Sequence, residues 1–100
     1  MSKNFIRLVS LNKTKRIISQ PHSKRLRSGF VVLKPKSSVG QHSTGKKEEI
    51  LIMIKGSALI SAGRQVKRVK QDHAVFIPKN TLHNVTNAGK ASLRYAYITA

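Results

Sequence analysis

The stretch of sequence that decides the fold runs from Gly40 to Gly56 and reads Gly-Gln-His-Ser-Thr-Gly-Lys-Lys-Glu-Glu-Ile-Leu-Ile-Met-Ile-Lys-Gly. Its first part is polar and carries His42, and its second part is an apolar run that opens with Glu49. A β-branched, apolar run bounded by a glycine is typical of a strand. If a turn at Gly45 folds the polar part against this strand, His42 and Glu49 converge on one interior point.

A second histidine arrives much later, in the segment Pro78-Lys79-Asn80-Thr81-Leu82-His83-Asn84. Two histidines and a carboxylate that face one cavity are ligands of the kind that hold a divalent transition metal. Taken singly, His42 is more typical of a polar loop residue, and His83 of a hydrogen-bonded core histidine. Their joint spacing favours a shared role, and we predict that His42, Glu49 and His83 bind a metal.

At these residues the chain resembles the cupin superfamily, whose first motif can be written G-x5-H-x-H-x3,4-E-x6-G. Its H, H, E and G places are occupied here by His42, Thr44, Glu49 and Gly56. The second motif, G-x5-P-x-G-x2-H-x3-N, falls on Asp72, Pro78, Asn80, His83 and Asn87. Thr44 therefore stands where the first motif has a histidine, and both glycines of the second motif are replaced. Asn80 is a mild departure, because asparagine tolerates a positive φ better than most residues do.

The resemblance implies an all-β fold built as a single jelly-roll β-barrel. It also implies a divalent transition metal as cofactor, and iron, zinc, manganese and nickel all accept such ligands. Two histidines and one carboxylate form the facial triad of non-haem iron oxygenases, so the set suffices although Thr44 replaces a ligand. We expect Thr44 either to hold a water on the metal or to fill the gap. The residues expected to line the remaining cavity, with ordinary barrel packing as the alternative, are Thr44, Met53, Tyr95 and Tyr97.

The remaining hydrophobic pattern indicates the same fold class without that resemblance. From Gly29 onward, short apolar runs recur at spacings of about eight to twelve residues with turn residues between them, which is typical of a β-sandwich or barrel. A chain of 100 residues makes one domain. We expect residues 29–100 to form the barrel and residues 1–28 to form a basic segment, either an edge strand or an arm.

The run from Glu49 to Lys55 is apolar on both of its faces, because side chains alternate along a strand. One face carries Glu49, Leu51 and Met53, and the other carries Ile50, Ile52 and Ile54. We therefore predict a strand that is buried on both sides. A small barrel has one interior, so the second face must meet the N-terminal segment or a second subunit, and we expect a homodimer.

Two neighbouring acids compete for the inward position. Glu48 and Glu49 lie on opposite faces of the strand, so only one of them can face the interior. The spacing to Gly56 favours Glu49. His73 falls where the second motif has a loop, and we expect it to be structural or exposed.

Charge is the unusual property of this composition. Twenty lysines and arginines stand against three acids, which gives a formal net charge of +17. Ten of those cations lie within the first 36 residues, where there is no acid. Such a field concentrates anions near the surface and is compatible with binding to a polyanion.

The composition also excludes several classes of protein. The chain contains no cysteine, so disulfides and thiolate ligands are excluded. No apolar run approaches the roughly 18 residues needed to span a bilayer. The N-terminal residues lack the apolar core of a signal peptide, and we expect a cytoplasmic protein.

Three functions follow from these observations. The one we favour is a small cupin-like protein that binds a divalent metal and a small ligand, anionic or sugar-like, with its reaction unassigned and enzymatic activity left open. The second is a metal-free binder of a small ligand. The third is a basic accessory protein that binds nucleic acid or another polyanion through residues 13–36.

Nucleic-acid binding by the basic segment would rest on phosphate contacts, because residues 6–29 contain no aromatic side chain for stacking on bases. Affinity for DNA falls with salt, so a plot of log affinity against log salt has a negative slope. Changing Lys24, Arg25 and Arg27 together to Gln is expected to reduce the magnitude of that slope by about two to three. Titration of duplex DNA at several salt concentrations measures that slope. Failure of the wild-type protein to bind DNA or RNA at about 50 mM salt would contradict this function.

Overall fold

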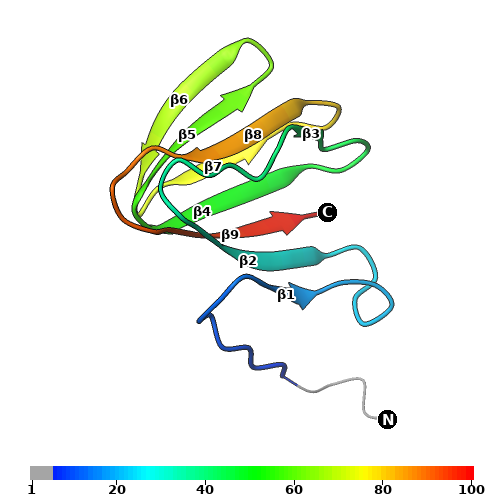
Figure 1. The fold of residues 1–100 in the computed structure, drawn as a ribbon. Coiled ribbons are helices and arrows are strands. Elements are labelled where there is room, and N and C mark those ends of the chain that lie inside the picture. The colour runs from blue at the N-terminus through cyan, green and yellow to red at the C-terminus, as the bar shows by residue number, and fades with distance from the viewer. Residues whose placement is uncertain (1–5) are drawn as a thin grey trace.

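The computed structural model describes residues 6–100, which form nine β-strands arranged in two sheets (Figure 1). The strands are β1 (Lys15–Ile18), β2 (Arg27–Leu33), β3 (His42–Ser43), β4 (Glu49–Lys55), β5 (Ser57–Ala62), β6 (Gln65–Lys70), β7 (Ala74–Ile77), β8 (Leu82–Asn87) and β9 (Leu93–Thr99). None of the residues from 6 to 100 lies in a helix, so the expected all-β class is confirmed. No helix in that part of the chain could cross a membrane.

The two sheets are stacked on a common hydrophobic core, as expected for a jelly roll. One sheet has the strand order β1-β2-β9-β4-β7 and the other has the order β3-β8-β5-β6. The first sheet contributes Leu51, Met53, Ile77, Leu93 and Tyr95 to the core, and the second contributes Ala58, Ile60, Val69 and Val85. All nine side chains are at most 9% exposed. The strands are hydrogen-bonded into two separate sheets that face each other, and they do not form one closed ring.

Strand β4 is buried on one face only within residues 6–100, so of the two predicted covers for its second face the second subunit remains a prediction. Glu49, Leu51 and Met53 are buried, whereas Ile50, Ile52 and Ile54 are each about two-fifths exposed. The interior accepts one face of the strand because alternate side chains point to opposite sides of the sheet. Nothing within residues 6–100 covers the other face to the same extent.

Turns at three motif positions have a positive φ, and each has a physical explanation. Gly56 has a φ of 94°, and a Cβ there would lie 3.1 Å from the Ser92 carbonyl oxygen, so glycine suits this turn. Asp72 and Asn80, which replace the two motif glycines, have φ values of 65° and 54°. Aspartate and asparagine are the side chains that best tolerate this left-handed region. The two residues that replace the motif glycines therefore keep the backbone conformation that the motif needs.

The N-terminal segment is part of the sheet from residue 15 onward. Strand β1 pairs antiparallel with β2, with Lys15 opposite Phe30 and Arg16 opposite Gly29. It forms the outer edge of the five-stranded sheet, beside β2 (Figure 1). Residues 1–5 lie outside the described residues.

The exposed face of β4 generates a prediction about association. We propose that Ile50, Ile52, Ile54 and Phe76, which is 58% exposed on the neighbouring strand β7, form the contact of a homodimer. Changing Ile52 to Lys is expected to shift the protein to a monomer, because it places a charge in an apolar contact. Light scattering at physiological salt measures this shift. The control Val66→Lys changes an exposed residue of β6 and should leave the mass of the protein in solution unchanged. A wild type that is monomeric at tens of micromolar would contradict the proposal.

Candidate metal centre and its cavity

Strand pairing brings the two motif histidines together. Strand β3 is only two residues long, and its His42 lies directly opposite His83 of β8. The two imidazole rings are 4.2 Å apart between centroids and tilted by 60°. His83 is 1% exposed, whereas His42 is exposed at the edge of the sheet. One histidine is therefore fixed in the interior, and the other closes the site from its open side.

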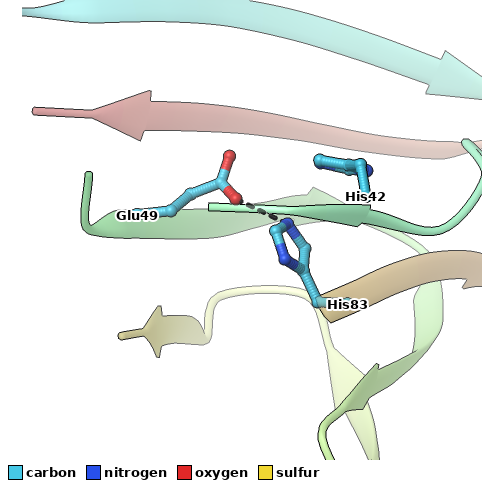
Figure 2. Close-up of side chains that lie close together, drawn as sticks. All are labelled: His42, Glu49 and His83. Carbon is cyan, nitrogen blue, oxygen red and sulfur yellow. Dashed lines mark ion pairs between the residues drawn. The ribbon is translucent and has the colours of Figure 1, made fainter. Parts of the chain in front are cut away.

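Glu49 reaches the same point from the opposite sheet, at the first residue of β4. Its Oε1 lies 2.8 Å from Nε2 of His83, and Figure 2 shows the carboxylate and both rings turned toward one another. Potential ligand atoms of His42, Glu49 and His83 all lie within 4.8 Å of one another. Glu48 is exposed, and its backbone pairs with that of Ala100, so Glu49 is the acid that faces the interior.

Backbone carbonyls orient both rings in the same way. Nδ1 of His42 lies 3.0 Å from the Gly40 carbonyl oxygen, and Nδ1 of His83 lies 3.0 Å from that of Thr81. A carbonyl oxygen can only accept, so each Nδ1 carries the proton and donates it. When such a ring is neutral, its Nε2 is unprotonated, which is the form in which histidine binds a metal.

The residues present fit a divalent metal. Nε2 of His83 is buried, and although it lies close to Glu49, the direction of that contact does not meet the geometry of a hydrogen bond. A buried polar atom without a well-directed partner is uncommon in folded proteins and calls for an explanation such as an ion. Two imidazole nitrogens and a carboxylate are the donor set that iron, zinc, manganese and nickel share.

Burial determines the proton affinity of Glu49. Removal of the carboxylate from water raises its pKa above the usual value of 4.5, and the neighbouring charges of His83 and His42 offset part of that rise. The carboxylate is thus held in a place where it needs a cationic neighbour. Either a protonated histidine or a metal ion supplies that charge.

Thr44, at the place of the missing motif histidine, uses its hydroxyl to hold two loops together. Its Oγ1 donates to the Pro78 carbonyl oxygen at 2.6 Å and accepts from the Thr81 amide at 3.1 Å. The proton of this hydroxyl is donated to a carbonyl oxygen, so in this arrangement Thr44 contributes a link between two loops. By linking the turn before β4 to the turn before β8, it helps to align Glu49 with His83.

A cavity of about 340 Å³ opens beside the three ligands. Thr44, Tyr95 and Tyr97 line it, whereas Met53 is 1% exposed and packs in the hydrophobic core instead. Burial is the main cause that raises the pKa of Tyr95, with smaller contributions from Glu49 and Tyr97. The Tyr95 hydroxyl therefore stays protonated and can donate a hydrogen bond into the cavity.

Five polar residues of the cavity wall were missed by the sequence analysis as site residues. They are Arg16, Arg27, Ser43, Lys47 and Thr99. The two arginines were expected to belong to a polyanion-binding arm, and no local motif distinguishes them from the other cations of the N-terminal segment. The sheet register, which joins β1 and β2 to β9, is what places them at this cavity.

Comparison with known proteins shows the family. Residues 29–99 match the family model described as the cupin domain, so this chain belongs to the cupin family. No curated protein matches the sequence.

Solved structures show that the fold is shared widely at low sequence identity. The cupin domain of Schizosaccharomyces pombe Cnp3 is 16% identical with a TM-score of 0.81, and the match covers 92% of this chain and 68% of that one. A cupin 2 conserved barrel domain protein from Salinispora arenicola is 18% identical with a TM-score of 0.80, covering 96% and 89% of the two chains. A predicted oxalate decarboxylase from Thermotoga maritima is 22% identical with a TM-score of 0.79, and the match covers 86% of this chain and 76% of that one.

The raised pKa of Glu49 generates a prediction for the metal-free protein. The folded state holds this proton to a higher pH than the unfolded chain does, so the contribution of Glu49 to stability is greatest below pH 4.5 and is lost as the pH rises through the folded-state pKa. The change Glu49→Gln removes that titration. We expect its free energy of unfolding, measured by urea in a chelator, to fall less between pH 4.5 and neutral pH than that of the wild type. Glu48→Gln, at the exposed neighbour, should follow the wild type, and identical pH profiles for all three proteins would contradict the assignment.

Proposed function

We propose that this protein binds a divalent transition metal through His42, Glu49 and His83, and a small ligand in the adjoining cavity. The observation that carries the proposal is the convergence of these three side chains from both sheets, with the buried Nε2 of His83 lacking a directed hydrogen bond. The ligand class that the cavity favours is small and anionic or sugar-like, because its wall carries cations, hydroxyls and an apolar surface. The reaction is unassigned.

The protein groups around the centre have distinct roles in this proposal. His83 and Glu49 are buried and hold the inner side of the site, while the exposed His42 faces the entrance. Tyr95 remains a hydrogen-bond donor to a ligand. The metal, when bound, would act as a Lewis acid that polarises an oxygen of the ligand.

A second candidate function is a metal-free binder of small ligands. The 2.8 Å contact between Glu49 and His83 favours it, because a protonated His83 would neutralise the buried carboxylate without an ion. The cavity would then bind ligands through the same tyrosines and cations. Metal content separates the two functions, since the other features of the site are common to both.

Elemental analysis of protein purified without chelators or metal-affinity resin tests the metal proposal. We expect close to one equivalent of a divalent metal in the wild type and less than about a tenth of that in His83→Gln, because a ligand is removed from a three-ligand set. The change His42→Ala should also reduce the content strongly, and its exposed position makes loss of folding an inadequate explanation.

The matched control is His73→Ala. His73 is an exposed histidine whose Nδ1 contacts the Gln71 carbonyl oxygen at 3.1 Å, which reproduces the local geometry of the two site histidines away from the cluster. Its metal content should equal that of the wild type. Equal metal content in the wild type and in the double variant His42→Ala/His83→Ala would refute the metal proposal.

A further inference from the structure

The cavity is cationic at the side that faces the N-terminal strands. Arg16 of β1, Arg27 of β2 and Lys47 of the turn before β4 contribute to its wall. Of the three acids in the chain, Glu49 alone lines it. Within residues 6–100 the one ion pair joins Glu49 to His83, so neither arginine has an acidic partner in the described part of the protein.

The register of the five-stranded sheet places these arginines on the inner face. Arg27 lies opposite Thr99, and Thr99 lies opposite Glu49, so the three residues form one row across β2, β9 and β4. Two strand spacings separate the Cα atoms of Arg27 and Glu49, which is about 10 Å. A small molecule between them can therefore face the metal ligands at one end and a guanidinium at the other.

The next row of the sheet that faces the interior, two residues along the strands, brings Arg16 to the same region. Arg16 lies opposite Gly29, which lies opposite Tyr97. A Cβ on Gly29 would collide with the ring of Tyr97, so the absence of a side chain there lets this ring lie across β2 toward β1. Tyr97 therefore lines the cavity in the same row of the sheet as Arg16.

A further polar group in this region lacks a partner. Oγ1 of Thr99 is buried and has no hydrogen bond within the described chain, although it lies in the row between Arg27 and Glu49. A buried hydroxyl without a partner is unfavourable, so this position beside the cavity favours a polar partner. The rest of the wall is largely apolar and includes Val31, Leu51 and Val85.

We infer that Arg16 and Arg27 bind the acidic group of a small organic acid, whose apolar body lies against the valine and leucine side chains of the cavity. The inference rests on the part of the proposed function that places a small ligand in this cavity. It narrows the ligand class from anionic or sugar-like to organic acids, because guanidinium groups match a carboxylate and the apolar wall does not match a polyhydroxylated body.

This assignment comes from residues outside the family match. The cupin domain covers residues 29–99, whereas Arg16 and Arg27 both precede it. The acid-binding end of the cavity is therefore built by residues that lie just before the stretch matched by the family model.

The test uses three probes on the 100-residue protein at about 150 mM salt, where long-range attraction by surface charge is screened. Benzoate carries a carboxylate on an apolar body, benzamide has the same shape without the charge, and inorganic phosphate is an anion without an apolar body. We expect benzoate to bind at least about tenfold more tightly than benzamide or phosphate in titrations followed by NMR, with shifts at Tyr97 and Thr99.

The decisive comparison is between two variants that lose the same charge. Arg16→Gln/Arg27→Gln should weaken benzoate binding at least about tenfold, because it removes charge-assisted hydrogen bonds to the carboxylate. Lys24→Gln/Arg25→Gln changes two exposed cations of the β1–β2 loop, neither of them in the cavity wall, and should weaken it less than about twofold. Thermal unfolding verifies that both variants are folded.

The outcomes separate this inference from the metal proposal. Equal weakening in the two double variants would show a general effect of net charge and would overturn the inference, as would preferential binding of phosphate or no binding of benzoate. Unchanged metal content in Arg16→Gln/Arg27→Gln with lost benzoate binding supports it. A wild type that contains no metal but binds benzoate through these arginines would refute the metal proposal and leave the acid site standing.

Discussion

The structure depends on the burial of one carboxylate between two sheets. Glu49 begins β4 on one sheet and contacts His83 of the other at 2.8 Å, beside the hydrophobic core that the two sheets share. Burial of an unpaired carboxylate costs several kcal/mol, so the position is tolerable only with a cationic partner that is itself held in place. The carbonyl oxygen of Thr81 orients that partner, and the hydroxyl of Thr44 joins the two turns that precede β4 and β8.

The same constraint makes the register of β4 specific. A slip of one residue would turn Glu49 to the surface and bring Glu48 and Ile50 inward, removing the acid from the histidines and Leu51 from the core. Asn87 fixes the end of β8 in a comparable way, because its buried amide donates to the carbonyl oxygens of Leu33 and Ala91 and accepts from the Gly89 amide. Polar groups with satisfied partners thus set the alignment of strands whose apolar side chains would pack in more than one register.

The cavity has two chemically different ends. Histidines from β3 and β8 and the carboxylate from β4 form one end, within the part of the chain that matches the cupin domain. Arginines from β1 and β2 form the other end, and the orphaned hydroxyl of Thr99 lies between them. The two ends of the cavity are therefore built by different parts of the chain, the arginines by residues just before the matched stretch.

The sequence by itself determined the all-β class and the main strands, because alternation along a strand is a local property, whereas the grouping of His42, Glu49 and His83 was predicted from their resemblance to the spacing of the cupin motifs. It also indicated that Asn80 could replace a glycine, and the φ of 54° agrees. Only the tertiary structure decided that one face of β4 stays exposed, that Met53 packs in the core, that the Thr44 hydroxyl is occupied, and that Arg16 and Arg27 reach the cavity. These facts depend on which strands are neighbours: β9, at the end of the chain, pairs with both β2 and β4, and that pairing between distant segments leaves no signal in the residues beside each arginine.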